Sequence, residues 1–323
     1  MDYWMHHVQL KLPFLVMPLA FATFGFIDEE LIIKVLKGFL IITLVSVIHT
    51  AIKYFLNMDF YNNLIARGQS MPTPIQHVNY SLILAFATVC SYFLFKDTRE
   101  KWLLIIGVVF FLFMHLIAVR TGLVALYVSV FIVAIMHTLK HRDYLKSGLV
   151  LLACILVPLA AYYAMPSLSS KVDYMLWDMT QFSKGKTADY SDGGRMVSYQ
   201  LGLDLFKENI WMGTGIGDMY NQCLQWYQTH ATDFKGKVNF PHNQFLHSLA
   251  STGIIGLILY QAALLVPFFK LQLYKVPYGL ILFVIIYTSF LVETSLERNY
   301  GIVFFLFFFL LWGVKKNPIS NTI

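Results

Sequence analysis

The run WLLIIGVVFFLFMHLIAV, residues 102–119, decides the fold class, because it contains no Asp, Glu, Lys or Arg. Similar apolar runs recur along the chain, and about 20 mostly apolar residues are enough to cross a bilayer as a helix. Of the 323 residues, 58% are hydrophobic and only 13% are charged, whereas soluble domains average about 25% charged residues. This shortage of charge excludes a disordered chain, a coiled coil and a soluble enzyme with an ordinary surface. The sequence therefore predicts an all-α polytopic membrane protein.

The apolar runs predict about nine transmembrane helices. Helices are expected because a helix satisfies its own backbone hydrogen bonds in lipid, where irregular chain cannot. The predicted spans cover residues 12–26, 31–55, 76–95, 102–119, 121–139, 145–165, 245–269, 277–292 and 301–314. The first of these carries two prolines and is short.

The basic residues of the predicted loops set the orientation of the spans. Positively charged loops stay in the cytoplasm, and basic residues gather in alternate loops, at Lys96, Arg99, Lys101, Lys140, Arg142, Lys146, Lys270, Lys275, Lys315 and Lys316. The net charge of +6 is then explained without a nucleic-acid partner, although the acidic stretch 28–30 opposes this orientation. Nine spans with a cytoplasmic C-terminus place the N-terminus outside, yet residue 1 is not followed by a signal peptide. Either a short N-terminal tail crosses the membrane unaided or an odd number of spans is missing upstream, and the parity favours the second alternative.

One polar segment separates the spans into two groups. Residues 166–241 hold 7 basic and 8 acidic residues, which is 15 of the 42 charged residues in the chain. A loop of this length is usually functional or folded. The predicted organisation is therefore N-terminal transmembrane helices (1–165), one large periplasmic loop containing short helices (166–241) and C-terminal transmembrane helices (242–323). We expect the chemistry to lie in or beside the large loop, outside the cytoplasm.

A histidine motif opens the seventh predicted span. It has the form H-N-x2-L-x6-G-x2-G, and at helical spacing one stripe would hold His242, Leu246, Leu249, Gly253 and Gly256. The two glycines would let another helix approach closely. His242 would lie at the outer mouth of this packed helix, where an imidazole can accept a proton from a hydroxyl. The alternative is an interfacial histidine without a chemical role.

Two arginines are placed to meet an anion. Arg120 begins the fifth predicted span, and its planar guanidinium suits phosphate oxygens, although it can also extend to lipid headgroups. Arg195 precedes a predicted helix at residues 196–209, where Asp192 or Gly194 would serve as the N-cap. Free N–H groups at that helix start would favour an anion too, while the alternative is a solvated loop arginine. This helix carries an apolar stripe, which predicts that it lies on the membrane surface. The residues of the stripe are Met196, Tyr199, Leu203 and Phe206.

The remaining patterns give weaker indications of function. The run Gly213-Thr214-Gly215-Ile216-Gly217 lacks the Lys-Ser/Thr and the strand of a nucleotide loop, so it is interpreted as a turn-rich connector. Glu293 and Glu297 are four residues apart and could form a glycosidase-like carboxylate pair, or Glu297 and Arg298 could hold an outer loop together. The sequence contains no metal-ligand motif and no nucleotide-binding motif. We therefore expect the protein to use neither a metal nor a cofactor.

Three ordered motifs resemble the O-antigen ligase family of bacterial polysaccharide assembly, which also contains O-antigen polymerases and O-linked oligosaccharyltransferases. They are Gly194-Arg195 with the following helix and glycine run, the His242-Asn243 motif with its two glycines, and Glu293-x-x-Leu296 before a final Phe/Leu-rich span. The resemblance is specific over residues 190–314. Over 76–165 it is looser, and there Arg120 resembles the family's arginine at the membrane boundary.

The resemblance implies a metal-independent, inverting glycosyltransferase of about a dozen spans in the bacterial inner membrane, active on the periplasmic face. The donor would be a glycan on undecaprenyl diphosphate, and the acceptor a sugar hydroxyl, in ligases that of lipid A–core. Arg120 and Arg195 would bind the diphosphate together with Asn243, and His242 would be the base. The alternatives are an O-antigen polymerase, a polysaccharide transporter or flippase, and a structural subunit whose boundary residues do not converge.

Overall fold

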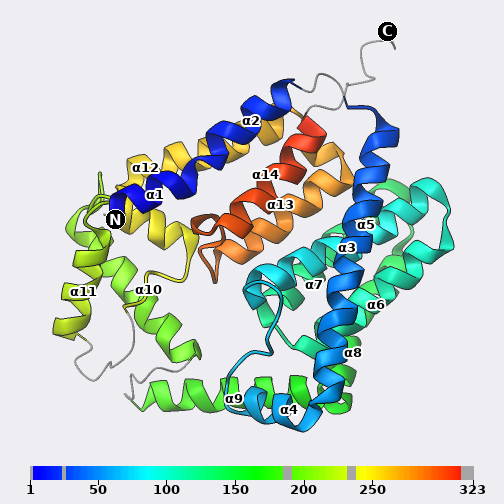
Figure 1. The fold of residues 1–323 in the computed structure, drawn as a ribbon, viewed down its shortest axis with the longest axis horizontal. Helices are drawn as coiled ribbons and strands as arrows, with labels where there is room; N and C mark the ends of the chain where they lie inside the picture. The colour runs from blue at the N-terminus through cyan, green and yellow to red at the C-terminus, as the bar shows by residue number, and fades with distance from the viewer. Residues whose placement is uncertain (1–2, 24–26, 185–190, 231–237, 314–323) are drawn as a thin grey trace.

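The computed structural model describes residues 3–23, 27–184, 191–230 and 238–313, and helices carry the fold throughout this part of the chain (Figure 1). The α-helices are α1 (Tyr3–Lys11), α2 (Pro13–Thr23), α3 (Glu29–Leu56), α4 (Met58–Ala66), α5 (His77–Thr98), α6 (Lys101–Ile117), α7 (Arg120–His141), α8 (Tyr144–Ala164), α9 (Pro166–Ser183), α10 (Ser191–Glu208), α11 (Met219–His230), α12 (Gln244–Lys270), α13 (Pro277–Phe290) and α14 (Asn299–Gly313). Two 3-10 turns, η1 (Leu273–Lys275) and η2 (Ser295–Glu297), flank α13.

Each predicted span coincides with a helix over its described residues, but the number of nine spans is not confirmed. Five helices among the described residues are long and apolar enough to cross a membrane, namely α3, α5, α7, α8 and α12. The helices α6, α13 and α14 are apolar but have only 17, 14 and 15 residues. The first predicted span is shorter still, because Pro13 begins α2 as a new helix of 11 residues.

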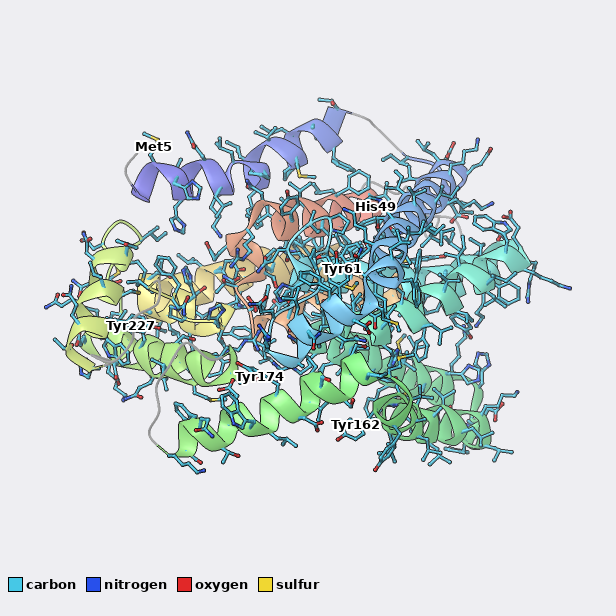
Figure 2. All side chains as sticks on the ribbon, turned by 60° about the horizontal axis from the view of Figure 1, so that its bottom comes forward. Met5, His49, Tyr61, Tyr162, Tyr174 and Tyr227 are labelled. Carbon is cyan, nitrogen blue, oxygen red and sulfur yellow. The ribbon has the colours of Figure 1, made fainter. Side chains whose placement is uncertain are left out.

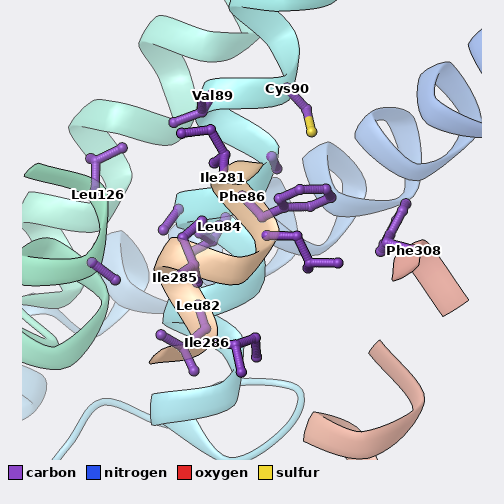
Figure 3. Close-up of a cluster of buried hydrophobic side chains, with 14 of the residues drawn as sticks. Leu82, Leu84, Phe86, Val89, Cys90, Leu126, Ile281, Ile285, Ile286 and Phe308 are labelled. Atoms are coloured by element: carbon purple, nitrogen blue, oxygen red, sulfur yellow. The ribbon is translucent and has the colours of Figure 1, made fainter. Parts of the chain in front are cut away.

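The hydrophobic core forms around α5. Within its most apolar stretch 72% of the residues are buried, against 28% or fewer in the other four long helices. Figure 3 shows Phe86 and Leu84 of α5 beside Ile281 and Ile285 of α13, with Phe308 of α14 nearby. Because protein covers most of α5, the end of this helix at His77 is held in a fixed position within the bundle.

Three helices occupy the described part of residues 166–241. In Figure 1, α9 runs along one edge of the molecule and leads back to α10, which packs against α9 and α12. A second, smaller core joins α10, α11 and α12, and it contains Val197, Leu201, Leu205, Met219, Cys223, Trp226, Tyr227 and Ala250. The polar segment is therefore folded onto the start of α12.

The helix predicted at 196–209 is present, but it begins five residues earlier, at Ser191. Met196 and Leu203 of the apolar stripe that is predicted to face the membrane are 36% and 44% exposed. A second apolar stripe, Val197, Leu201 and Leu205, is buried against α11 and α12. That tertiary contact is not revealed by spacing along one helix.

Candidate functional site

A cavity of about 340 Å³ opens where the N-terminal ends of several helices meet the segments around residues 242 and 293. Its walls come from the start of α5, the start of α7, the middle of α9 and the first turn of α10. The lining residues are Gly68, Ser70, Gln76, His77, Val78, Ala118, Val119, Arg120, Thr121, Lys171, Gly194, Arg195, Asn239, His242 and Glu293. The three predicted residues Arg120, Arg195 and His242 therefore share one cavity.

A tight turn between α6 and α7 places Arg120. The helix α6 ends at Ala118, whose φ of 51° lies in the left-handed region, and α7 begins two residues later. At Gly122, an added Cβ would overlap the side chain of Ser81 on α5, so glycine lets the two helices pack closely. The guanidinium of Arg120 then donates to both carboxylate oxygens of Asp192, at 2.8 and 3.0 Å.

The start of α10 is capped by a residue of another helix. Asp178 of α9 is fully buried, and its carboxylate accepts hydrogen bonds from the backbone N–H groups of Asp192 and Gly193, the former at 2.6 Å. Asp192 or Gly194 was expected to cap this helix, and the free N–H groups were expected to favour an external anion. Both expectations are wrong in this structure, because Asp178 fills the position. Asp192 is left to bind the arginines.

A chain of ionic contacts joins the two arginines to the histidine. Arg195 donates to Asp192 at 3.1 Å and to Glu293 at 3.2 Å. The other oxygen of Glu293 lies 3.6 Å from Nδ1 of His242. The order of contacts is therefore Arg120, Asp192, Arg195, Glu293 and His242. This shared site argues against a structural subunit with unrelated boundary residues.

Glu293 lies beside both the histidine and Arg195. Burial by itself would raise its pKa, but His242 and Arg195 outweigh burial and lower the pKa below the ordinary value, so the side chain is ionised. The ionised carboxylate is close enough to Nδ1 of His242 to be the counter-charge of this ring when the ring is protonated.

Of the two interpretations of Glu293 and Glu297, the glycosidase-like carboxylate pair is not formed. Glu297 turns away from the cavity and accepts hydrogen bonds from Lys11 at 2.7 Å and from Gln244 at 3.0 Å. Glu297 is the last residue of the 3-10 turn η2 and Glu293 lies before that turn, so their spacing of four residues is not that of a continuous helix. Glu297 therefore ties α1 to the start of α12, and Glu293 alone faces the cavity.

Lys171 is a cavity residue that the sequence did not single out. It projects from α9, which lies across the front of Figure 2 and carries Tyr174. Its Nζ donates to the carbonyl oxygens of Gly68 and Gln69, at 2.8 and 2.7 Å. Burial and the nearby charge of Arg120 lower its pKa to about 8. No sequence pattern distinguishes Lys171 from other lysines of the polar segment. His77, at the start of α5, also lines the cavity.

Asn243 and the two glycines have structural roles. Asn243 is the N-cap of α12, where its side-chain oxygen accepts from the N–H groups of Phe245 and Leu246 and its amide donates to the carbonyl of Leu291. Gly253 meets the backbone of Trp211 in a loop, rather than another helix, and at Gly256 the nearest side chain is that of Thr252 in the same helix.

The cavity is suited to an anion. Three cationic side chains, Arg120, Lys171 and Arg195, line it together with one carboxylate, and the arginines present the donors that phosphate oxygens accept. Over residues 3–23, 27–184, 191–230 and 238–313, no group of three His, Cys, Asp or Glu side chains is placed to hold a metal ion.

The helices and the cavity define a multi-pass membrane protein with a polar cavity that brings two arginines, a lysine and an imidazole together. The chain belongs to the O-antigen ligase family, because the sequence model of that family matches residues 84–261, which is 178 of the 323 residues. Members of this family are glycosyltransferase-like enzymes, ligases or polymerases, that use lipid-linked glycans in a membrane. The matched region includes Arg120, Arg195 and His242 but ends before Glu293. No curated protein matches the chain.

Proposed function

We propose that the protein is an O-antigen ligase-like glycosyltransferase that moves a glycan from undecaprenyl diphosphate to a sugar hydroxyl of lipid A–core, on the periplasmic face of the inner membrane. The observation that carries this proposal is the convergence of Arg120, Arg195 and His242 on one cavity. A diphosphate donor needs fixed cations, and an acceptor hydroxyl needs a base within hydrogen-bond reach. Both requirements meet here within a family whose members transfer glycans.

In the proposed reaction the cations bind the donor. Arg120 and Arg195 hold the phosphate oxygens, Lys171 adds a third charge, and Asp192 keeps the two guanidinium groups side by side despite their repulsion. Negative charge develops on the diphosphate as the bond between the anomeric carbon and its oxygen breaks. Cations that are already in place stabilise that charge without reorganisation.

His242 performs the proton transfer in this scheme. The acceptor hydroxyl oxygen attacks the anomeric carbon from the face opposite the diphosphate and gives its proton to the imidazole. The new carbon–oxygen bond forms as the diphosphate leaves, so the anomeric configuration inverts. Glu293 stabilises the imidazolium, which then loses its proton to water. The products are the glycosylated acceptor and undecaprenyl diphosphate, and no metal takes part.

A transfer assay in lipid tests the proposal. Purified protein would receive a glycan on undecaprenyl diphosphate, with lipid A–core or free glycan as the acceptor. We expect a product on lipid A–core that falls by about 10²-fold or more in His242→Ala, the usual range for removing a general base. His49→Ala is the matched control, since His49 is exposed on α3 and outside the cavity.

Each other outcome has a defined meaning. A product on free glycan alone would make the protein a polymerase. A product that His242→Ala leaves intact would remove His242 from the mechanism. Absence of product with both acceptors, while the lipid-linked donor crosses the bilayer, would replace the transferase with a transporter.

A further inference from the structure

The helix α12 is interrupted one third of the way along its length. Gly253 has φ 66° and ψ −168°, a conformation that only glycine adopts readily, and the helix resumes after it. An interruption removes the hydrogen bonds that a helix makes within itself. In a membrane-spanning helix the freed N–H and carbonyl groups need other partners, because lipid supplies none.

The connector between α10 and α11 supplies those partners. The N–H groups of Ile254 and Ile255 donate to the carbonyls of Ile210 and Trp211, at 2.9 and 3.3 Å. In the reverse direction, Thr214 and Gly215 donate from their N–H groups to the carbonyls of Ala250 and Ser251, at 2.8 and 3.0 Å. Four backbone hydrogen bonds therefore fasten the connector to the break in α12.

Glycine is required on both sides of this contact. At Gly213 an added Cβ would overlap the backbone at Thr252, and at Gly253 it would overlap the carbonyl of Trp211. Gly213 also has a positive φ, of 67°. The two backbones touch without intervening side chains, so the connector stays at the level of Gly253.

The connector exposes apolar side chains next to the apolar surface of α12. Trp211 and Met212 are 67% and 70% exposed, and Ile210 and Ile216 are 44% and 40% exposed. Below the break, α12 itself exposes Ile255, Ile258 and Leu259 in the same way. Large apolar groups exposed beside a membrane span are expected to contact lipid, and tryptophan favours the boundary between hydrocarbon and headgroups.

The length of α12 places the connector at that boundary. Residues 254–270 form the uninterrupted part of the helix, and 17 residues at a rise of about 1.5 Å extend about 26 Å. The hydrocarbon core is about 30 Å thick. With the charged Lys270 at one boundary of the core, Gly253 and the bound connector lie at the opposite boundary.

We propose that the segment Ile210–Ile216 is a membrane-interface anchor that inserts Trp211 and Met212 into the lipid leaflet beside the cavity. The anchor follows directly on α10, whose first turn carries Arg195. One end of α10 is thus bound to lipid and the other lines the cavity, which fixes the height of the cations relative to the headgroups. The anchor does not depend on the proposed transfer reaction, because it is inferred from the hydrogen bonds between the connector and α12, the exposed apolar side chains and the length of α12.

A fluorescent probe at residue 212 tests this insertion. Met212→Cys, in a Cys154→Ser background, would be labelled with a polarity-sensitive bimane and reconstituted into phosphatidylglycerol–phosphatidylethanolamine vesicles with or without brominated acyl chains. Cys90 and Cys223 are buried and remain unlabelled. Gln225→Cys, at an exposed polar position on α11, is the matched control. We expect brominated lipid to quench the probe at 212 at least about threefold more than the probe at 225, and aqueous iodide to show the reverse order.

A conservative variant of the native protein gives a second measurement. Trp211→Phe keeps an aromatic ring and the backbone contacts, so the fold is preserved. Brominated lipid should quench a smaller share of the intrinsic fluorescence in this variant than in the parent. If the probe at 212 is quenched by iodide as strongly as the probe at 225, and Trp211→Phe leaves quenching by brominated lipid unchanged, the segment does not enter the membrane and the proposal is overturned.

Discussion

At the scale of single residues, Glu293 connects binding to catalysis, because one carboxylate contacts both Arg195 and His242. Glu293→Gln keeps a hydrogen-bonding side chain of the same size but removes the charge opposite the imidazole. We expect kcat to fall by about 10²-fold, since the imidazolium loses its counter-charge, while the KM for the donor changes only a few-fold.

Glu297→Gln is the matched control for Glu293. It removes the partner of Lys11 outside the cavity, so it should lower thermal stability and leave kcat within a few-fold of the parent. Steady-state kinetics with the lipid-linked donor, together with a thermal melt of each variant, separates the two roles. Equal losses of kcat in both variants would mean that Glu293 acts only through the fold.

Lys171 gives donor binding a dependence on pH. Its pKa of about 8 in the free protein rises when a diphosphate binds, because an anion favours the charged amine. Donor affinity is therefore fully present below pH 8 and declines as the pH rises from there toward the higher pKa of the bound form. Between pH 7.5 and 9.5 we expect about a tenfold loss of affinity, measured as KM or as direct binding of the lipid-linked donor.

Two variants distinguish the titration of Lys171 from a general effect of high pH on the protein. Lys171→Gln should bind the donor weakly at every pH in this range and lose the dependence. Lys184→Gln, at an exposed position after α9, should behave like the parent. If the donor affinity of Lys171→Gln declines with pH as steeply as that of the parent, Lys171 is not the group that causes the pH dependence.

The candidate site could be predicted only in part, and the reason differs between residues. Arg120 and His242 begin apolar spans, where a lone charged or titratable group is conspicuous in the sequence. Lys171 belongs to an amphipathic helix in a charged segment, and its burial depends on the carbonyls of Gly68 and Gln69, about 100 positions away. Glu293 was noticed, but its partners come from α10 and from the start of α12, and only the folded chain brings them together.

At the scale of helices, the apolar runs predicted where the apolar helices lie, whereas the ends and the interruption of these helices depend on tertiary contacts. The pattern of α12 continues through Gly253 without a change of composition, so the interruption is invisible in the sequence. The run Gly213–Gly217 lies in the connector between α10 and α11, as predicted, but its hydrogen bonds to α12 were not foreseen. A break in one helix and a glycine-rich loop far from it form a single structural feature.

Gly253→Ala tests this feature directly. An alanine there must adopt a backbone conformation reserved for glycine and would overlap the carbonyl of Trp211. We expect the free energy of unfolding to fall by about 3 kcal/mol or more, combining backbone strain with overpacking. The measurement is an unfolding titration in mixed micelles.

Gly148→Ala is the control for Gly253→Ala, because an added Cβ at Gly148 meets nothing within 4 Å and the residue lies inside α8. That variant should be neutral or slightly more stable, since alanine favours helix. Should Gly253→Ala unfold like Gly148→Ala, the contact between α12 and the connector contributes little to stability.

At the scale of the whole molecule, the cavity and the basic loops lie at opposite ends of the same helices. The helices α5, α7 and α12 all begin at or beside the cavity, and each is followed by a basic turn. The positive-inside rule places those turns in the cytoplasm. On this orientation we expect the cavity to face the periplasm, where the proposed donor, with its diphosphate among the headgroups, would reach the arginines without crossing the bilayer.

Cysteine labelling in intact cells tests this orientation. Lys140→Cys and Gln225→Cys both introduce a thiol at an exposed position, one in the last turn of α7 and the other on α11 near the cavity end of α12. In a Cys154→Ser background, a membrane-impermeant maleimide applied to spheroplasts should label residue 225 at least about tenfold more than residue 140. Lysis should make the two equal. Preferential labelling of residue 140 before lysis would turn the cavity toward the cytoplasm, and a periplasmic transfer reaction would then be impossible at this site.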